Sequence, residues 1–448
     1  MVAIHSLIGK LNLFFFATIL LSTKAFSNSV LLPGSSLEDF FTSAINYSTE
    51  LRISEESLKI GSARKRAASG QLLPQINAGA SISDNRINQM DQFRQFDGER
   101  FYLSLTQVLF NWQAFSERKR ASFVEDQLEE EYYYQLAAIL TEVAERYLNV
   151  LQSSDALDSI ESEINALTNQ LEQIQSLFDR QLAQVTDVYQ GQASLAAAQA
   201  EQLRLEAEQA LAREYLRSVS GLEVGPLYRL SDGSSAPELE YTQQYYVDQA
   251  QEKNHLILAS KSAVRAAQER VSGQRGAYAP TVSFIAQRQD SDVGFDNLPI
   301  ARTDNTYVGL NLSIPIYRGG TNRAAVSEAL SMQNIAEYEL RASELEARQR
   351  VRSAYLQLEA SRTQIEAARI LVESTALASE AMQQGFSLGT VTSVDVLNAL
   401  KDQFRAERDL QRTRYDQIKF FLILKRETGA LAAEDMIEVG EWLEPGTL

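Results

Sequence analysis

The chain has 448 residues, a formal net charge of −17 and no cysteine. Without cysteine it can form neither a disulfide nor a thiolate metal site, and its 2 histidines leave little material for a histidine-built metal centre or catalytic triad. An acidic chain also lacks the positive surface that binds a nucleic-acid backbone, so we expect no nucleic-acid partner. Its 8 prolines leave residues 75–225 and 316–444 free of proline, which predicts very long helices.

The first 27 residues have the composition of an export signal. Lys10 precedes an apolar run at residues 11–21, and Ala25-Phe26-Ser27 offers small residues at the two positions that a signal peptidase recognises. The run is shorter than the about 20 residues of a membrane-spanning helix, and an N-terminal anchor is the alternative. We expect a signal peptide at residues 1–27 and an exported mature chain at residues 28–448.

The mature sequence contains an internal duplication at an offset of about 206 residues. Four landmarks recur in the same order, with residues 72–76, 102–105, 111–114 and 186–188 corresponding to 278–282, 307–310, 318–321 and 394–396. We therefore predict one domain of two structural repeats, at about 36–220 and 241–430. A linker at 221–240, marked by Pro226 and Pro237, joins the repeats, and a short C-terminal tail follows.

Both repeats have the same predicted order of elements. The first begins with a helix at 36–70, continues with strands at 76–83 and 101–106 around a polar loop at 88–99, and ends with helices at 112–182 and 186–219. The second has a helix at 241–273, strands at 281–287 and 307–314 around a loop at 291–305, and helices at 319–388 and 392–428. This order predicts a mainly helical protein with a β-sheet part.

The predicted strands alternate apolar and polar residues, as in Ile76, Ala78, Ala80 and Ile82. Each strand is about ten residues long, which is the length that crosses a bilayer, although a half-buried sheet of a soluble domain has the same pattern. Four strands are too few to close a barrel, because about eight are needed. An exported chain with four membrane strands must therefore share a barrel with other copies of itself.

The long helices have a coiled-coil pattern. Apolar residues recur at alternating spacings of three and four, namely Leu157, Ile160, Ile164, Leu167, Leu171, Ile174 and Phe178. A helix of 70 residues is roughly 105 Å long. The helix predicted at 186–219 is rich in alanine, which permits close approach of a neighbouring helix.

Several segments resemble the TolC family of outer-membrane channel proteins. The most specific are residues 312–320 (LSIPIYRGG) and residues 385–390 (GFSLGT) leading to Val394-Asp395-Val396-Leu397, and residues 170–173 and 186–188 match as well. The resemblance implies a homotrimer in the outer membrane of a Gram-negative cell. Three copies of four strands would form a twelve-stranded β-barrel, and the long helical hairpins would form an α-barrel that tapers shut in the periplasm.

The resemblance also implies a function. The protein would be a passive exit duct of a tripartite efflux or type I secretion system, without cofactor or enzymatic activity. A periplasmic adaptor protein and an inner-membrane transporter of RND or ABC type would open its periplasmic end. The alternative is a structural coiled-coil surface protein or adhesin without transport activity, which explains the heptads but not the duplicated amphipathic hairpins.

The resemblance identifies a candidate entrance at the second helix-turn-helix tip. Asp395 matches the aspartate that projects into the narrowest part of the family's lumen, where three carboxylates would attract cations and repel anions. The alternative role for Asp395 is a helix-capping acid in the first turn, and the two roles are compatible. Asn398 stands where the family has a second aspartate, so we expect one carboxylate ring.

The polar lock of the family entrance is altered in this sequence. Phe386 stands where the family commonly has a tyrosine, and Val391 stands where it has a basic residue. In the family these groups pair with polar residues that match Gln170, Thr186 and Asp187. Because phenylalanine lacks the hydroxyl and valine lacks the charge, we expect the closed entrance to be held less firmly.

The turns at the two tips are the expected docking region for the adaptor. Gly385 and Gly389 bracket the second tip, and glycine permits the backbone conformation that a helix reversal requires. Thr390 belongs to the same turn, and the first tip has Leu177 and Gln181 in place of the two glycines. Because the first tip has no glycine, we expect that the two reversals need not be alike.

Overall fold

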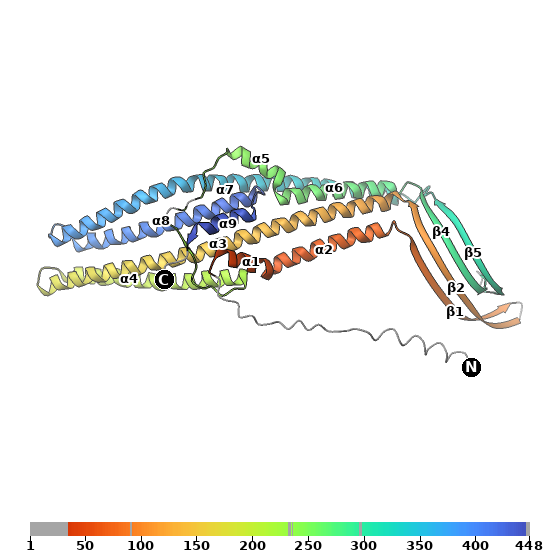
Figure 1. The fold of residues 1–448 in the computed structure, drawn as a ribbon, viewed down its shortest axis with the longest axis horizontal. Helices are drawn as coiled ribbons and strands as arrows, with labels where there is room; N and C mark the ends of the chain where they lie inside the picture. Colours follow the sequence, from red (N-terminus) through yellow and green to blue (C-terminus); the bar gives the residue numbers. More distant parts are fainter. Residues whose placement is uncertain (1–34, 90–91, 232–233, 235, 295–297, 445–448) are drawn as a thin grey trace.

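A computed structural model describes residues 35–89, 92–231, 234, 236–294 and 298–444. The predicted signal peptide at residues 1–27 lies outside the described residues. The protein is elongated, with a twisted β-sheet at one end and two helix-turn-helix tips at the other (Figure 1). No helix within the described part is long and apolar enough to cross a membrane.

The elements of the two halves follow one another in the same order. The first half contains α1 (Leu37–Tyr47), α2 (Thr49–Gly70), β1 (Gln75–Gln89), β2 (Gln92–Phe110), α3 (Trp112–Asp179) and α4 (Val185–Ser220). The second contains α5 (Gln243–Lys253), α6 (His255–Gly276), β4 (Thr281–Val293), β5 (Pro299–Ser313), α7 (Thr321–Ser387) and α8 (Ser393–Glu427). Between and after them lie β3 (Arg229–Leu230), α9 (Ala433–Glu441) and β6 (Leu443–Glu444).

The four long strands form one antiparallel sheet in the order β1-β2-β4-β5. The β2–β4 pair joins the two halves, and β1 and β5 form the edges of the sheet. Ile76, Leu105, Ala286 and Val308 are successive partners across the strands, so their side chains share one face. On the edge strands this face is open, with Ile76 67% and Val308 62% exposed.

The loops predicted at 88–99 and 291–305 are wrong, because the strands continue through most of both segments. β1 runs to Gln89 and β2 starts at Gln92, while β4 runs to Val293 and β5 starts at Pro299. Most residues of this outer part of the sheet are polar, since a backbone ladder needs no apolar side chain. Cross-strand ion pairs take the place of apolar contacts there, with Arg288 2.6 Å from Asp304 and Arg302 2.9 Å from Asp290.

The helices predicted at 36–70 and 241–273 are each two helices, broken at Ser48 and at Asn254. Both breaks have nearly the same backbone angles, φ −59° and ψ 119° at Ser48 and φ −65° and ψ 121° at Asn254. The Ser48 side chain accepts a hydrogen bond from the Leu51 N–H, and that of Asn254 accepts from Leu256 and Ile257. These caps begin a new helix inside a segment whose apolar pattern is continuous.

Each return helix ends against one of these breaks. α4 ends at Gly221 (φ +72°), which lies against the Tyr47 ring, and α8 is followed by Gly429 (φ +68°), which lies against the Lys253 carbonyl. The Asn254 side chain donates to the carbonyl oxygen of Glu427 at 2.8 Å. The return helices are thereby fixed to the positions where the first helix pair of each half bends.

The largest hydrophobic core lies at the middle of the long axis, where α1, α5 and α9 pack against α3, α7 and α8. The predicted linker at 221–240 and the predicted C-terminal tail belong to this core, since β3 pairs with β6 and Leu222 and Val439 are buried. The Tyr147 hydroxyl donates to the Ser35 carbonyl at 2.9 Å and accepts from the Tyr228 N–H at 2.9 Å. We call this layer of α1, α5, α9, β3 and β6 the equatorial layer.

We predict that Gly429→Ala lowers the free energy of unfolding by roughly 2 kcal/mol, because alanine is strained at positive φ. Its Cβ would also lie 2.1 Å from the Lys253 carbonyl oxygen. The control is Gly440→Ala, whose Cβ meets nothing within 4 Å. Thermal unfolding followed by far-UV circular dichroism measures both, and equal midpoints would contradict the assigned role of Gly429.

Candidate functional site

The first tip reverses the chain between α3 and α4. The N–H of Gln181 donates to the Phe178 carbonyl and that of Leu182 to the Leu177 carbonyl, both at 2.8 Å. Gln181 has φ +62° and is the one non-glycine residue with positive φ in the described chain. A left-handed residue in this position closes the end of a helix, and glutamine adopts it here at a steric cost.

The second tip reverses the chain between α7 and α8 with the same pattern. The N–H of Gly389 donates to the Phe386 carbonyl at 3.0 Å, and that of Thr390 to the Gly385 carbonyl at 2.9 Å. Gly389 has φ +75°, and it corresponds to Gln181 of the first tip. The two reversals, which we expected could differ, therefore share one geometry. A Cβ on Gly385 would lie 2.5 Å from the Val391 side chain, so close approach explains that glycine.

A cleft of about 990 Å³ lies between the two tips. Four of the predicted site residues line it, namely Thr186, Asp187, Phe386 and Gly389. Val391, which follows the second turn, lines it as well. The cleft therefore brings together side chains from both halves of the chain. Asp395 and Asn398 of α8 do not line it.

Asp395 is the third residue of α8 and is exposed. Its carboxylate accepts hydrogen bonds from the Thr392 hydroxyl at 2.6 Å and the Thr392 N–H at 3.3 Å. In return the Thr392 hydroxyl accepts from the Asp395 N–H at 3.3 Å, which completes a capping box. The capping role of Asp395 is present, and its exposed position leaves the carboxylate in contact with solvent as well.

Asp187 has the corresponding position in α4 and connects the two tips. Its carboxylate accepts from the N–H of Gln184 at 3.1 Å and from the hydroxyl of Ser393 at 2.8 Å. The second bond joins the start of α4 to the start of α8. Sequence reasoning placed Asp187 at the entrance but missed Ser393, and the only sequence signal was its position next to the Thr392 cap.

Phe386 and Val391 pack against an apolar cluster beside the cleft. The buried members of this cluster come from α3, α4 and α8: Leu157, Ile160, Leu167, Ala198, Leu205, Val396, Leu397 and Leu400. Gln170 is buried, and within the described residues its side-chain nitrogen has no hydrogen-bond partner. Apolar contacts therefore occupy the place in which the resemblance implied polar pairs with Gln170 and Asp187.

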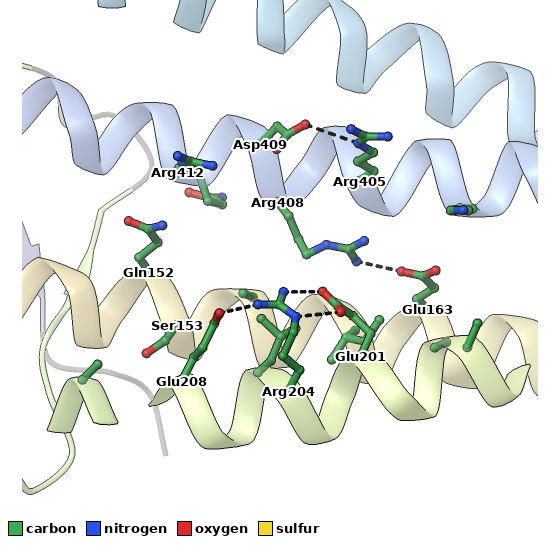
Figure 2. A pocket seen from close by; sticks show the side chains of 18 of the residues that line it. Gln152, Ser153, Glu163, Glu201, Arg204, Glu208, Arg405, Arg408, Asp409 and Arg412 are labelled. Carbon is green, nitrogen blue, oxygen red and sulfur yellow. Dashed lines mark hydrogen bonds and ion pairs between the residues drawn. The ribbon is translucent and has the colours of Figure 1, made fainter. Parts of the chain in front are cut away.

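Asn398 lies farther along α8 and lines a second, larger groove of about 1120 Å³. This groove lies between α8 and the α3–α4 hairpin (Figure 2). The described residues contain no group of three or more histidine, aspartate or glutamate side chains that could hold a metal ion. In the part of the chain that the structure describes, helix caps, the hydrogen bond from Ser393 to Asp187 and apolar packing hold the tip region.

We predict that Ser393→Ala loosens both tips, because it removes the hydroxyl that bonds Asp187 and a hydrogen bond is worth about 1 kcal/mol. Hydrogen–deuterium exchange of tip peptides should then rise about fivefold at the starts of both α4 and α8. The control is Ser387→Ala, whose hydroxyl bonds only the Gln384 carbonyl of its own helix. Exchange that rises in α8 alone would show that the bond between the tips contributes nothing.

Comparison with known proteins assigns nearly the whole chain to one protein family. The profile of the family described as outer membrane efflux protein matches residues 42–222 and 246–430. The outer membrane protein TolC of Vibrio cholerae serotype O1 is 27% identical over 382 residues, which cover 83% of this chain and 86% of that protein. The alkaline protease secretion protein AprF of Pseudomonas aeruginosa is 26% identical over 380 residues, 82% of this chain and 78% of that protein.

Solved structures show the shared fold. The outer membrane protein VceC of Vibrio cholerae superimposes with a TM-score of 0.76 at 18% identity, over 88% of this chain and 96% of that one. The outer membrane channel CmeC of Campylobacter jejuni gives a TM-score of 0.77 at 14% identity, over 92% and 93%. These matches confirm the mainly helical fold with long hairpins and four strands. The chain belongs to the outer membrane efflux protein family and is a non-enzymatic, TolC-type efflux or secretion channel of the Gram-negative outer membrane.

Proposed function

We propose that three copies of this chain close head to tail into an exit duct that a periplasmic adaptor and an inner-membrane transporter of RND or ABC type open at the tips. The observation that carries the proposal is that the strands and helices of one chain form a single open row. The elements at the two edges of this row have a neighbour on one side only. Four strands and four helices at each level leave backbone and apolar side chains without partners in a single copy.

The same half of the chain supplies the same edge at every level. Contacts between elements give the order β1-β2-β4-β5 in the sheet, α2-α3-α6-α7 next to it and α4-α3-α8-α7 toward the tips. One edge therefore consists of β1, α2 and α4, and the other of β5 and α7. Two different edges that run the whole length suit a head-to-tail interface, which closes into a ring.

The edge helices carry apolar side chains on the faces that point away from their neighbours. On α7 these are Tyr338, Leu345, Leu356, Ile370 and Leu377, exposed by 75%, 49%, 55%, 57% and 61%. Their spacings keep them on one helix face, opposite the buried Ala347, Ala354 and Leu358. On α4, Tyr189 and Leu203 are likewise more than half exposed. A second copy would cover both stripes.

A trimer would gather three pairs of tips at the periplasmic end. Three exposed Asp395 carboxylates around a constriction would attract cations, as one ring, because Asn398 is uncharged. In this proposal the Phe386 and Val391 contacts and the bond from Ser393 to Asp187 hold the tips together, with Thr186 and Gln170 nearby. The turns with Gln181, Gly385, Gly389 and Thr390 form the surface for the adaptor. Secretion is one candidate use, since the relative AprF is named for alkaline protease secretion.

We predict that Leu356→Glu on α7 abolishes the trimer, because a charge in an apolar interface costs several kcal/mol. Native mass spectrometry of the detergent-solubilised protein measures the oligomer, and circular dichroism checks that the helix content is unchanged. The control is Gln357→Glu, which introduces the same residue at an exposed position beside the stripe. A trimer that survives Leu356→Glu would refute the proposed edge.

We predict that Asp395→Ala lowers the cation preference of the channel in planar-bilayer recordings, while Asn398→Asp raises it by adding a second ring. The control is Glu434→Ala, which removes one exposed acid from α9, far from the tips. Reversal potentials in a salt gradient give the cation-to-anion permeability ratio. An unchanged ratio in Asp395→Ala would remove Asp395 from the entrance.

A further inference from the structure

The groove between α8 and the α3–α4 hairpin is distinct from the cleft at the tips. It lies between that cleft and the equatorial core, and α3, α4 and α8 all contribute to its lining (Figure 2). Its volume of about 1120 Å³ exceeds that of the tip cleft. A space of this size accommodates an organic molecule.

The α3 side of the groove faces away from the equatorial layer. Tyr147 points toward that layer, because its hydroxyl bonds to the backbone of Ser35 and Tyr228. Ala156 lines the groove nine positions later on the same helix. At 3.6 residues per turn, nine positions are two and a half turns, so the two side chains point to opposite sides.

The α8 side of the groove gives the same direction. Arg414 points toward the equatorial layer, where it donates to the Ser231 carbonyl at 2.6 Å. Arg405 lines the groove nine positions earlier, on the opposite side of α8. If the equatorial layer is the outside of the closed duct, the groove opens into its lumen.

Small side chains of α4 make the floor of the groove deep. Ala193, Ala197 and Ala198 line it together with Ile160 and Leu167 of α3. The three alanines belong to the alanine-rich run that the sequence shows in α4. Longer side chains at the same positions would fill the space, so the run leaves an apolar floor rather than a solid contact.

The rim of the groove is cationic, although the chain as a whole has a charge of −17. Lys401, Arg405, Arg408 and Arg412 follow one another on α8 at spacings of four, three and four, which keeps them on one face. With Arg204 and Arg146, six cations line the groove against four acids, namely Glu163, Glu201, Glu208 and Asp409.

The acids neutralise only part of this rim. Arg408 is 2.7 Å from the buried Glu163, and Arg204 is held between Glu201 and Glu208. Hydrogen bonding by Arg204 keeps the pKa of Glu201 below its ordinary value.

Arg146 is 3.3 Å from Glu142, which leaves Lys401, Arg405 and Arg412 as the rim cations available to a ligand. Arg405 has only a loose contact of 3.9 Å with Asp409, and Arg412 one of 3.7 Å with Asp416. Lys401 is exposed and has no ion pair within the described part of the chain.

We propose that this groove binds organic anions that pass through the duct, with the apolar body of the anion on the alanine floor and its acidic groups against Lys401, Arg405 and Arg412. The site deepens the proposed function and rests on it, because it assigns a class of cargo to the lumen. The lumen of the duct would then have two stretches. Asp395 at the tips attracts cations, and the rim cations of the groove, farther from the tips on α8, retain anions.

The test uses the purified full chain in neutral detergent and the trisulfonated aromatic dye pyranine, whose binding is measured by fluorescence anisotropy. Arg405→Glu should weaken binding about tenfold, because it replaces an attraction by a repulsion. Arg405→Lys should bind nearly as the parent protein does. The matched control is Arg213→Glu on α4, nine positions from Arg204 and outside the groove, which should leave binding unchanged.

A charge-neutral variant tests the floor. Ala197→Leu should weaken binding several-fold by filling the groove, with the rim intact. Equal binding by Arg405→Glu and Arg213→Glu would overturn the proposal, and so would full binding by Ala197→Leu, since the dye would then lie elsewhere. Native mass spectrometry of the same samples distinguishes failure of the anion site from failure of the proposed duct. Trimers that bind no dye refute this site alone, whereas the absence of trimers refutes the proposed duct.

Discussion

The structure depends on one seam that runs the length of α3 and continues into β2. On one side of this seam lie α2, α4 and β1, and on the other lie α6, α8 and β4. A single uninterrupted helix of 68 residues therefore carries the contact between the two halves from the sheet to the tips. Because the seam uses only one side of each half, the far sides of the two halves remain open in a single chain.

Much of the architecture could be predicted from the sequence because its signals are local and repeated. The two proline-free spans and the three-four apolar spacing gave the long helices within a few residues, for example 112–182 against Trp112–Asp179. The breaks at Ser48 and Asn254 could not be predicted in this way, because a serine or asparagine inside an apolar pattern is compatible with an intact helix. The strand ends were missed because most of their residues are polar, without a regular apolar alternation, and backbone bonds and ion pairs hold them.

Four of the site residues named from the sequence lie together in the structure, but their hydrogen-bond partners could not be predicted. Thr186, Asp187, Phe386 and Gly389 line one cleft, yet the bond from Asp187 goes to Ser393, which only the approach of two distant helix starts could reveal. The left-handed conformation of Gln181 had no sequence signal either, because its local sequence contains no glycine.

The tip also shows how one residue pair changes the nature of a contact. With phenylalanine at 386 and valine at 391, the contact across the helix starts is apolar and joins a larger cluster. Such a contact weakens little with salt, whereas an ion pair at the same place would be screened. Apolar packing does not fix the relative orientation of the two helix starts. The hydrogen bond from Ser393 to Asp187 does, because it is directional.

The fixed ends of the return helices determine the cross-section of the wall. Toward the tips, α4 and α8 flank α3, and beyond the breaks α2 and α6 take their places on the same sides. The chain thus has four helices side by side at every level, and the changeover occurs where Gly221 and Gly429 stop one helix against the bend of the next. If a return helix stopped one turn early, it would leave an opening about 5 Å high. In the proposed duct such an opening would be a leak, so these two glycines would close the wall between its upper and lower parts.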